Sequence, residues 1–293
     1  MNHRITSGMR VFNVFNVIVL SALALAMFLP YLNIFAQSLS SAKAITNGWV
    51  SLWPVEFTWI NYQYVFQDPT IWRAFLISVI ITVCGTAINL VMTSSLAYPL
   101  SRPEYVGRKY IILMVLFTMI FSAPLIPVFI LIKSLGMMNT LWAVMIPNAI
   151  AAFNFFIMRS FFMNIPSELI DSSRIDGCGE MGILWRIVVP LSKPAMATMG
   201  IYYAVYHWNS YTNALYYLNE RSLYPLQIKL RQMIDTDTTN MDPNAALFSE
   251  TLSMSPEGIK MATVFVATIP ILLVYPFLQK YFVKGMMIGS VKA

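Results

Sequence analysis

Six long stretches without a charged side chain constrain the fold of this 293-residue chain more than any other feature. Each stretch is at least as long as the roughly 20 residues that an α-helix needs to cross the hydrocarbon core of a bilayer. Buried helices of a large soluble protein would need charged outer faces, yet the chain is 58% apolar and only 11% charged. The sequence therefore predicts an all-α, polytopic membrane protein with six transmembrane helices, at about residues 11–36, 74–98, 110–132, 140–162, 194–217 and 261–280.

The first stretch has a second interpretation, a cleaved signal peptide, because Arg4 and Arg10 precede it. Its apolar part, Val11–Ala36, is longer than the apolar region of a signal peptide, and its small residues between Ala22 and Ala26 lie inside that part. We therefore expect a helix that is retained in the protein.

The distribution of basic residues predicts the orientation in the membrane. With the N-terminus in the cytoplasm, the predicted cytoplasmic segments hold twelve of the 19 Lys and Arg residues, and the longer outer segments hold seven. Such an excess is typical of cytoplasmic segments, so we expect a multi-pass membrane protein with both termini in the cytoplasm. The net charge of +6 then reflects topology, and no clustered basic face indicates a nucleic-acid partner.

The interiors of the predicted spans lack Asp, Glu, Lys and Arg, and His207 is the only histidine at depth. Because carriers driven by ion gradients commonly place ionisable groups in mid-membrane, this pattern favours energy supplied from outside the spans. Two alternatives stay open: an ion-coupled secondary solute carrier that binds sodium through carbonyl groups, and a membrane enzyme. The enzyme would need clustered His, Asp or Glu, and the only other histidine is His3. Cys84 and Cys178 fall in different segments and predict neither a disulfide nor a zinc site.

Two predicted outer segments are long. Residues 37–73 are rich in Trp and Tyr, which predicts either an aromatic belt at the membrane interface or a docking surface for an external protein. The outer loop 217–260 is rich in Asn, Asp, Thr, Ser and Pro and is long enough to project from the membrane. Several predicted spans also contain proline, which membrane helices tolerate with or without a kink.

The segment 164–193, which we call the 164–193 loop, is the main exception to the apolar pattern. Its charged residues are Glu168, Asp171, Arg174, Asp176, Glu180, Arg186 and Lys193. We expect an N-cap at Ser167, a helix to about Ile175, and a sharp turn where Gly177 and Gly179 break that helix. Composition alone is equally consistent with a plain amphipathic hairpin on the inner membrane face.

A second helix is predicted in the later part of the 164–193 loop. Its apolar stripe has the spacing i, i+3, i+4, i+7 and consists of Met181, Leu184, Trp185 and Val188. We expect Pro190 and Pro194 to end this helix before the fifth span.

The spacing within this loop resembles a known family. Residues 171–177 read D-S-S-R-I-D-G, nine residues follow, and residues 187–194 read I-V-V-P-L-S-K-P. This pattern resembles the E-A-A loop of ABC-importer permeases, with Asp for Glu, two serines for the alanines, and Val189 for a leucine. In addition, W-N-S-Y at 208–211, Y-P-L-Q at 224–227 and the C-terminal tail resemble the carbohydrate-uptake branch of that family. Within that branch, the chain resembles maltose-type second permeases and permeases for oligosaccharides and polysaccharides, including those of alginate importers.

The resemblance implies an ABC type I importer permease fold for the whole chain, with no catalytic residue in it. It implies that the loop is a coupling helix on a cytoplasmic ATPase dimer, with contacts at Glu168, Asp171, Ser172, Ser173, Asp176 and Gly177. ATP and magnesium would bind to the ATPase, because the chain lacks the motif G-x-x-x-x-G-K-[ST]. The C-terminal residues 285–293 are a second candidate contact.

Further partners follow from the same resemblance. They are a second, homologous permease, an external solute-binding protein that the 217–260 loop helps to unload, and a saccharide substrate. Candidate residues of the substrate path are Asn154, Trp208 and Asn209, because sugar sites combine aromatic faces with amide groups. The alternative is that these polar groups bond neighbouring helices. Which saccharide passes is left open.

Overall fold

The computed structural model describes residues 7–239 and 255–290 of the chain, and throughout these ranges the regular structure is helical, with no strand. The chain divides into two compact units: Met1–Pro69 with Leu230–Ile269, and Thr70–Lys229 with Pro270–Ala293. We call them unit 1 and unit 2 and describe each by itself. The predicted all-α class is confirmed.

Unit 1 contains three helices before its boundary: α1 (Ser7–Ser38), α2 (Ala42–Thr46) and α3 (Ile60–Gln67). The hydroxyl of Ser41 caps α2 by accepting the N–H of Ala44. The buried amide of Asn61 donates to the carbonyls of Ser38 and Ser40, and so joins α3 to the end of α1. The tryptophans of the predicted aromatic segment are exposed, which both of its interpretations require.

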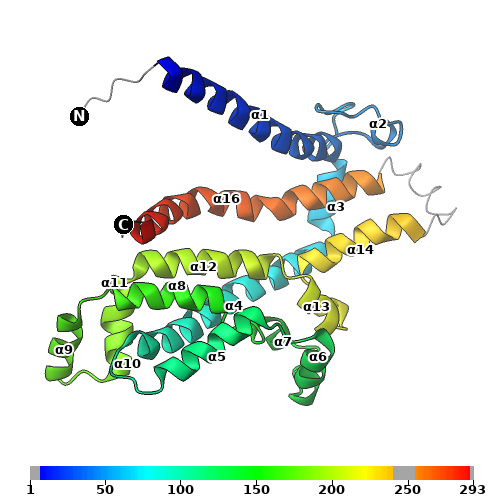
Figure 1. Ribbon diagram of the computed structural model, residues 1–293. Coiled ribbons are helices and arrows are strands. Elements are labelled where there is room, and N and C mark those ends of the chain that lie inside the picture. Colours follow the sequence, from blue (N-terminus) through cyan, green and yellow to red (C-terminus); the bar gives the residue numbers. More distant parts are fainter. Residues whose placement is uncertain (1–6, 240–254, 291–293) are drawn as a thin grey trace. The chain divides into compact units, whose positions relative to one another are not determined.

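The helices of unit 2 and those that continue across its boundaries can be followed in Figure 1. They are α4 (Pro69–Ser101), α5 (Arg108–Ile120), α6 (Leu125–Ser134), α7 (Trp142–Met145), α8 (Ala152–Met163), α9 (Ser167–Ile175), α10 (Glu180–Ile183), a π-helix (Leu184–Val188), α11 (Val189–Leu191), α12 (Lys193–Trp208), α13 (Thr212–Tyr217), a 3-10 turn (Arg221–Leu223), α14 (Leu226–Thr239) and α16 (Pro256–Ser290).

Three described helices are long and apolar enough to cross a membrane as single pieces. They include Gly8–Ser38, Pro69–Ser101 and Pro256–Val274, and they correspond to the first, second and sixth predicted spans. The predicted third span is not one straight helix, because α5 and α6 are bent by 120° at the break between them. The break precedes Pro124, which lacks a backbone N–H and starts α6 in an extended conformation. By contrast, α16 continues through Pro270.

The predicted fourth and fifth spans are also interrupted. Residues 140–162 fold into α7 and α8, with Pro147 in the gap, and residues 194–217 fold into α12 and α13. At 12 and 16 residues, α8 and α12 are each shorter than a usual spanning helix. The passage of these two segments through the membrane therefore stays a prediction.

The largest apolar core of unit 2 lies where α8 packs against α12 and α5. Its fully buried side chains include Phe155, Phe162 and Tyr203. Ile170 of α9 and Leu184 of the π-helix join the same core. Figure 1 shows α9, α10 and α11 together at one end of unit 2, with α6, α7 and α13 at the other. The core thus fixes the 164–193 loop to the ends of the long helices.

Candidate functional site: the 164–193 loop

Helix α9 ends as the sequence predicts. The backbone of Gly177 has φ +81°, a left-handed conformation that costs glycine little. Cys178 N–H donates to the carbonyl of Ser173 at 2.9 Å, and Gly177 N–H donates to that of Arg174 at 3.0 Å. These two bonds form a Schellman motif, which satisfies carbonyls left over at the helix end. The turn at Gly177 is therefore tightly specified, and Gly179 follows it with an ordinary φ of −72°.

The predicted N-cap of α9 is wrong by one residue. Pro166 occupies the cap position with φ −53° and ψ 133°, and Ser167 is the first helical residue. No side chain caps the helix. The fixed φ of proline suits the entry into a helix, so Pro166 takes the place where a serine hydroxyl would otherwise accept a hydrogen bond.

The residues expected to contact the ATPase lie largely at the surface. Five of the six are exposed and Ser173 is half-buried; the exposed ones are Glu168, Asp171, Ser172, Asp176 and Gly177. Ile170 is only 2% exposed and packs into the core. Helix α9 therefore buries one apolar residue and presents its polar residues outward, as a docking helix must.

The two serines that replace alanines are locally satisfied. The hydroxyls of Ser172 and Ser173 both donate to the carbonyl of Leu169, at 3.2 and 2.6 Å. Because each hydroxyl folds back onto its own helix, neither needs a partner on a docked protein. The serines can therefore pack against a partner much as alanines would.

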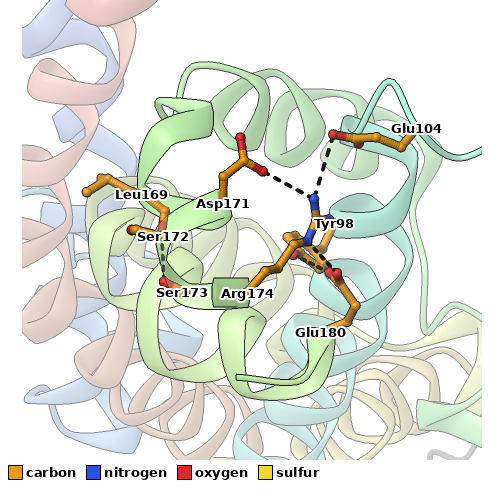
Figure 2. Close-up of polar contacts among 8 residues, drawn as sticks. All are labelled: Tyr98, Glu104, Leu169, Asp171, Ser172, Ser173, Arg174 and Glu180. Carbon is orange, nitrogen blue, oxygen red and sulfur yellow. Dashed lines mark hydrogen bonds and ion pairs between the residues drawn. The ribbon is translucent and has the colours of Figure 1, made fainter. Parts of the chain in front are cut away.

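Arg174 is the centre of an ionic cluster that sequence reasoning missed. Its guanidinium lies 2.8 Å from Glu180 Oε1, 3.4 Å from Asp171 Oδ1 and 3.8 Å from Glu104 Oε1. Figure 2 shows Arg174 among these three carboxylates, which come from α9, the α4–α5 connection and α10. Only the contact with Asp171 could have been predicted from the sequence, because residues three positions apart on a helix are neighbours. The other two partners become neighbours through the tertiary fold.

Glu180 joins this cluster to α4. Its second oxygen, Oε2, accepts a hydrogen bond from the hydroxyl of Tyr98 at 2.6 Å. This bond, together with the contact to Arg174, holds the pKa of Glu180 below its usual value, although partial burial acts in the opposite sense. The hydrogen bond to Glu180 in turn raises the pKa of Arg174. Both groups are therefore firmly ionised at neutral pH.

The ion pairs contribute little to stability. The side chain of Arg174 is 34% exposed and its carboxylate partners are 58–60% exposed. Exposed pairs of this kind contribute about 0.2–1 kcal/mol each, because water screens them. The cluster thus mainly fixes the position of α9.

Arg102 supports the other side of Tyr98. Its guanidinium carbon lies 5.5 Å from the centre of the Tyr98 ring, and Nη2 donates to the carbonyl of Phe162 at 2.6 Å. Burial lowers the pKa of Arg102, since water is largely excluded from it. A cavity of about 420 Å³ lies beside these groups and is lined among others by Tyr98, Arg102, Arg174 and Glu180.

The second helix of the loop differs from its prediction. Ile183, Leu184 and Val188 are buried, whereas Met181 is 65% and Trp185 37% exposed. Residues Leu184–Val188 form a π-helix, whose turns are wider than the 3.6-residue period used for the prediction. The predicted apolar stripe is therefore divided, with Leu184 and Val188 in the core and Met181 and Trp185 outside it.

The prolines do not end this helix as expected. Pro190 lies inside α11 and Pro194 lies in the first turn of α12, so that helical structure is interrupted only at Ser192. Pro190 cannot donate a hydrogen bond to the carbonyl four residues earlier, and the π-helix immediately before it accommodates that loss. The loop consequently passes into α12 almost without a break.

The candidate residues of the substrate path do not form one site. Asn154 is 6% and Trp208 7% exposed, whereas Asn209 is exposed and donates to the carbonyl of Val205. Asn154 lines a cavity of about 290 Å³ with tyrosines, and Asn209 lines another of about 340 Å³. Tyr206 borders both.

Asn154 and Trp208 carry polar groups that form no hydrogen bond with the described residues. No hydrogen bond joins the Asn154 amide to any described residue. The indole N–H of Trp208 is buried and likewise unpaired within the described part of the chain, while its ring packs edge-on against Phe75. The alternative that these groups bond neighbouring helices is therefore not what this structure shows for these two residues.

The neighbouring side chain of His207, by contrast, is hydrogen-bonded inside the protein. Its Nε2 lies 2.8 Å from Asn89 Oδ1, and the Asn89 amide donates to the carbonyl of Asn148 at 2.7 Å. The helix α4 approaches closely at Gly85, where an added Cβ would lie 2.6 Å from the His207 ring. His207 thus ties α12 to α4.

Comparison with known proteins decides the family. The family model described as "Binding-protein-dependent transport system inner membrane component" matches residues 104–288. The chain belongs to this family. The suggested resemblance to ABC-importer permeases is thereby confirmed, and the chain is a membrane translocation subunit of a transport system rather than an enzyme. The family description places it in the inner membrane and makes its transport system dependent on a binding protein.

Individual relatives cover nearly the whole chain. Protein LplC of Bacillus subtilis (strain 168) is 43% identical over 98% of this chain and 97% of its own. The polygalacturonan/rhamnogalacturonan transport system permease protein YtcP of the same organism is 44% identical over 92% of this chain and 94% of its own. A chain in the crystal structure of a bacterial ABC transporter involved in the import of the acidic polysaccharide alginate is 34% identical, with a TM-score of 0.88, over 94% of this chain and 98% of that one.

Proposed function

We propose that this inner-membrane permease imports an oligosaccharide, with transport driven by a separate ATPase that acts through the 164–193 loop. The near full-length likeness to YtcP and to the alginate transporter carries the proposal, because the first is named for transport of polygalacturonan and rhamnogalacturonan and the second for import of the acidic polysaccharide alginate. An acidic oligosaccharide is accordingly the preferred substrate class.

The surface of α9 supports the coupling role. A docking helix must be rigid at its ends and must keep its polar face free. The Schellman motif around Gly177 fixes one end, and buried Ile170 fixes the register of the helix on the core. The exposed carboxylates of Glu168, Asp171 and Asp176 then suit a partner with basic or N–H donor groups.

The wider assembly follows from this role. Two ATPase subunits, which bind ATP and magnesium, dock at the cytoplasmic face, and a second homologous permease completes the membrane pathway. A solute-binding protein delivers the saccharide at the opposite face. Both termini lie in the cytoplasm. Residues 235–254 of the 217–260 loop and the tail from 285 onward lie outside the residues whose side chains the structure describes.

Asn154 and the neighbouring tyrosines support a substrate path. The cavity beside Asn154 is also lined by Tyr202, Tyr203 and Tyr206, so that an unpaired amide faces aromatic rings. Sugar hydroxyls can bond the amide while a sugar ring stacks on an aromatic face. Trp208 and Asn209 would act at a separate point of the path.

The substrate class is tested by ATPase activity. The complex is reconstituted with its binding protein, and ATP hydrolysis is measured with oligogalacturonate, alginate oligomers or neutral arabino-oligosaccharides. Stimulation by one of the acidic oligosaccharides supports the preferred class. Stimulation by the neutral sugar alone contradicts it while leaving the importer function intact.

A further inference from the structure

We propose that Tyr98, Arg174 and Glu180 form a polar link that carries the movement of α9 directly to the end of α4. A docked ATPase would then move α4 through side chains, in addition to moving α12 through the backbone. This inference rests on the proposed function, since it takes α9 as the ATPase contact. Arg174 and Glu180 are positioning residues in this link.

One carboxylate makes both contacts of the link. Glu180 Oε1 accepts from Arg174 Nε at 2.8 Å, and Glu180 Oε2 accepts from Tyr98 Oη at 2.6 Å. In Figure 2 the dashed lines of both bonds meet at the carboxylate of Glu180. Glu180 is ionised in both bonds, and charge-assisted bonds are shorter and more directional than neutral ones even where exposure keeps their contribution to stability small. The link therefore runs from α9 through the start of α10 to α4.

Tyr98 is well placed to receive a displacement. It is 5% exposed and belongs to the same core as Phe155 and Phe162 of α8. Arg102 stacks on its ring and bonds the carbonyl of Phe162. Because packed interiors transmit strain, a shift of Tyr98 displaces the ends of both α4 and α8.

A cavity beside the link leaves Arg174 and Glu180 as the contacts between α9 and α4 on this face. Since about 420 Å³ of space is lined by residues of α4, α9 and α10, these segments are not closely packed along this face. Apart from the backbone, α9 is held to the core by Ile170. Arg174 and Glu180 bridge the remaining space, so their loss would let α9 move with less effect on α4.

The ionic cluster also allows exchange of partners. Asp171 Oδ1 lies 3.4 Å from Arg174 Nη1, a longer contact than that from Glu180. If the ATPase captures Asp171, Arg174 keeps its shorter contact with Glu180. The link can thus stay closed while α9 is docked. A link that differs in strength between the two transport states shifts their equilibrium.

The cleanest test removes one hydroxyl. Tyr98→Phe abolishes the bond to Glu180 but keeps the buried ring and its stacking with Arg102. The control is Tyr105→Phe, because Tyr105 lines the same cavity and its hydroxyl bonds no described residue. In proteoliposomes containing the complete transporter, we expect Tyr98→Phe to lower the saccharide imported per ATP hydrolysed by about three- to tenfold, as for a partly lost charge-assisted bond. Tyr105→Phe should give the wild-type ratio, and both variants should assemble with the ATPase as the wild type does.

Glu180→Ala keeps the proposal testable if Tyr98→Phe alone assembles poorly, because it removes the acceptor of the same bond and leaves the Tyr98 ring unchanged; it should lower the transport ratio as Tyr98→Phe does. Where both variants assemble, a serial link is already broken by Glu180→Ala, so adding Tyr98→Phe should lower the ratio no further. Independent, additive effects would overturn the link. So would a wild-type transport ratio in an assembled Tyr98→Phe transporter. A wild-type complex without ATP-dependent uptake would instead contradict the proposed function.

Discussion

Cys178 N–H donates to the carbonyl of Ser173 at 2.9 Å and closes α9 across Gly177. This bond requires the left-handed backbone at Gly177, where φ is +81°. The end of the docking helix therefore depends on one residue without a side chain.

Replacement of Gly177 by Val should disturb this turn. A β-branched residue in the left-handed region costs about 1–2 kcal/mol, so the turn should rearrange and the ATPase should dock poorly. ATPase co-purification and ATP-driven uptake measure the effect. Gly179→Ala is the matched control, because Gly179 has φ −72° and no atom near an added Cβ. Equal assembly and uptake in both variants would remove the role of this turn.

Asp171→Lys should prevent docking by reversing an exposed charge of α9. It also places a second cation beside Arg174, which now lies 3.4 Å from the carboxylate. We expect loss of most co-purified ATPase, measured by subunit stoichiometry. Arg186→Gln serves as the control, since Arg186 is exposed in the same loop but outside α9. Normal stoichiometry in Asp171→Lys would contradict the assigned contact.

Gly85→Ala should destabilise the chain. The added Cβ would lie 2.6 Å from the His207 ring, so α4 and α12 must separate or the ring must leave Asn89. Overpacking of this kind costs about 1–3 kcal/mol. Gly200→Ala is the control, because its closest neighbour, Leu90, would lie at 3.5 Å. Thermal unfolding in detergent should separate the two variants, and identical midpoints would refute this packing.

Asn154→Leu and Asn89→Leu should fail in different ways. Asn89 bonds both His207 and the Asn148 carbonyl, so its replacement leaves buried groups unpaired and lowers stability by about 1–3 kcal/mol. Asn154 bonds no described residue, so Asn154→Leu should keep stability and reduce saccharide uptake. Thermal unfolding and uptake measured side by side decide this. Full uptake in a stable Asn154→Leu transporter would exclude the amide from the path.

The contribution of Glu180 to stability should be lost in acid. The groups facing it are Tyr98, Arg102 and Arg174, with Glu104 farther along the cluster. Its folded-state pKa is depressed, so its contribution is complete above the unfolded value, about 4.3, and is lost as the pH falls through the folded value. The difference in thermal stability between wild type and Glu180→Gln should be constant from pH 6 to 8 and should shrink in acid. A difference that grows in acid would reverse the assigned sign.

Local rules predicted the C-terminal end of α9 well. The end of α9 at Ile175 and the turn at Gly177 depend on neighbouring residues, and both are confirmed. The Tyr98–Glu180 bond could not be predicted, because its partners belong to different helices and meet only through the packed core. The π-helix at Leu184–Val188 could not be predicted either, because an apolar pattern read with a fixed 3.6-residue period does not reveal it.

The prolines in the predicted spans do not by themselves predict where a helix breaks. Pro124 follows a sharp break, whereas α16 continues through Pro270. The outcome depends on whether neighbouring groups satisfy the freed carbonyl, which is a tertiary property. The sequence therefore locates the apolar stretches but does not reveal where their helices bend or break.

ATP-driven uptake tests the central claim most directly. The chain is reconstituted with its partner permease, ATPase and binding protein, and labelled oligogalacturonate is followed into proteoliposomes. We predict uptake that requires ATP and the binding protein, and that disappears when Asp171→Lys replaces the wild-type chain. Uptake by this chain alone, driven by a sodium or proton gradient without ATPase, would contradict the account.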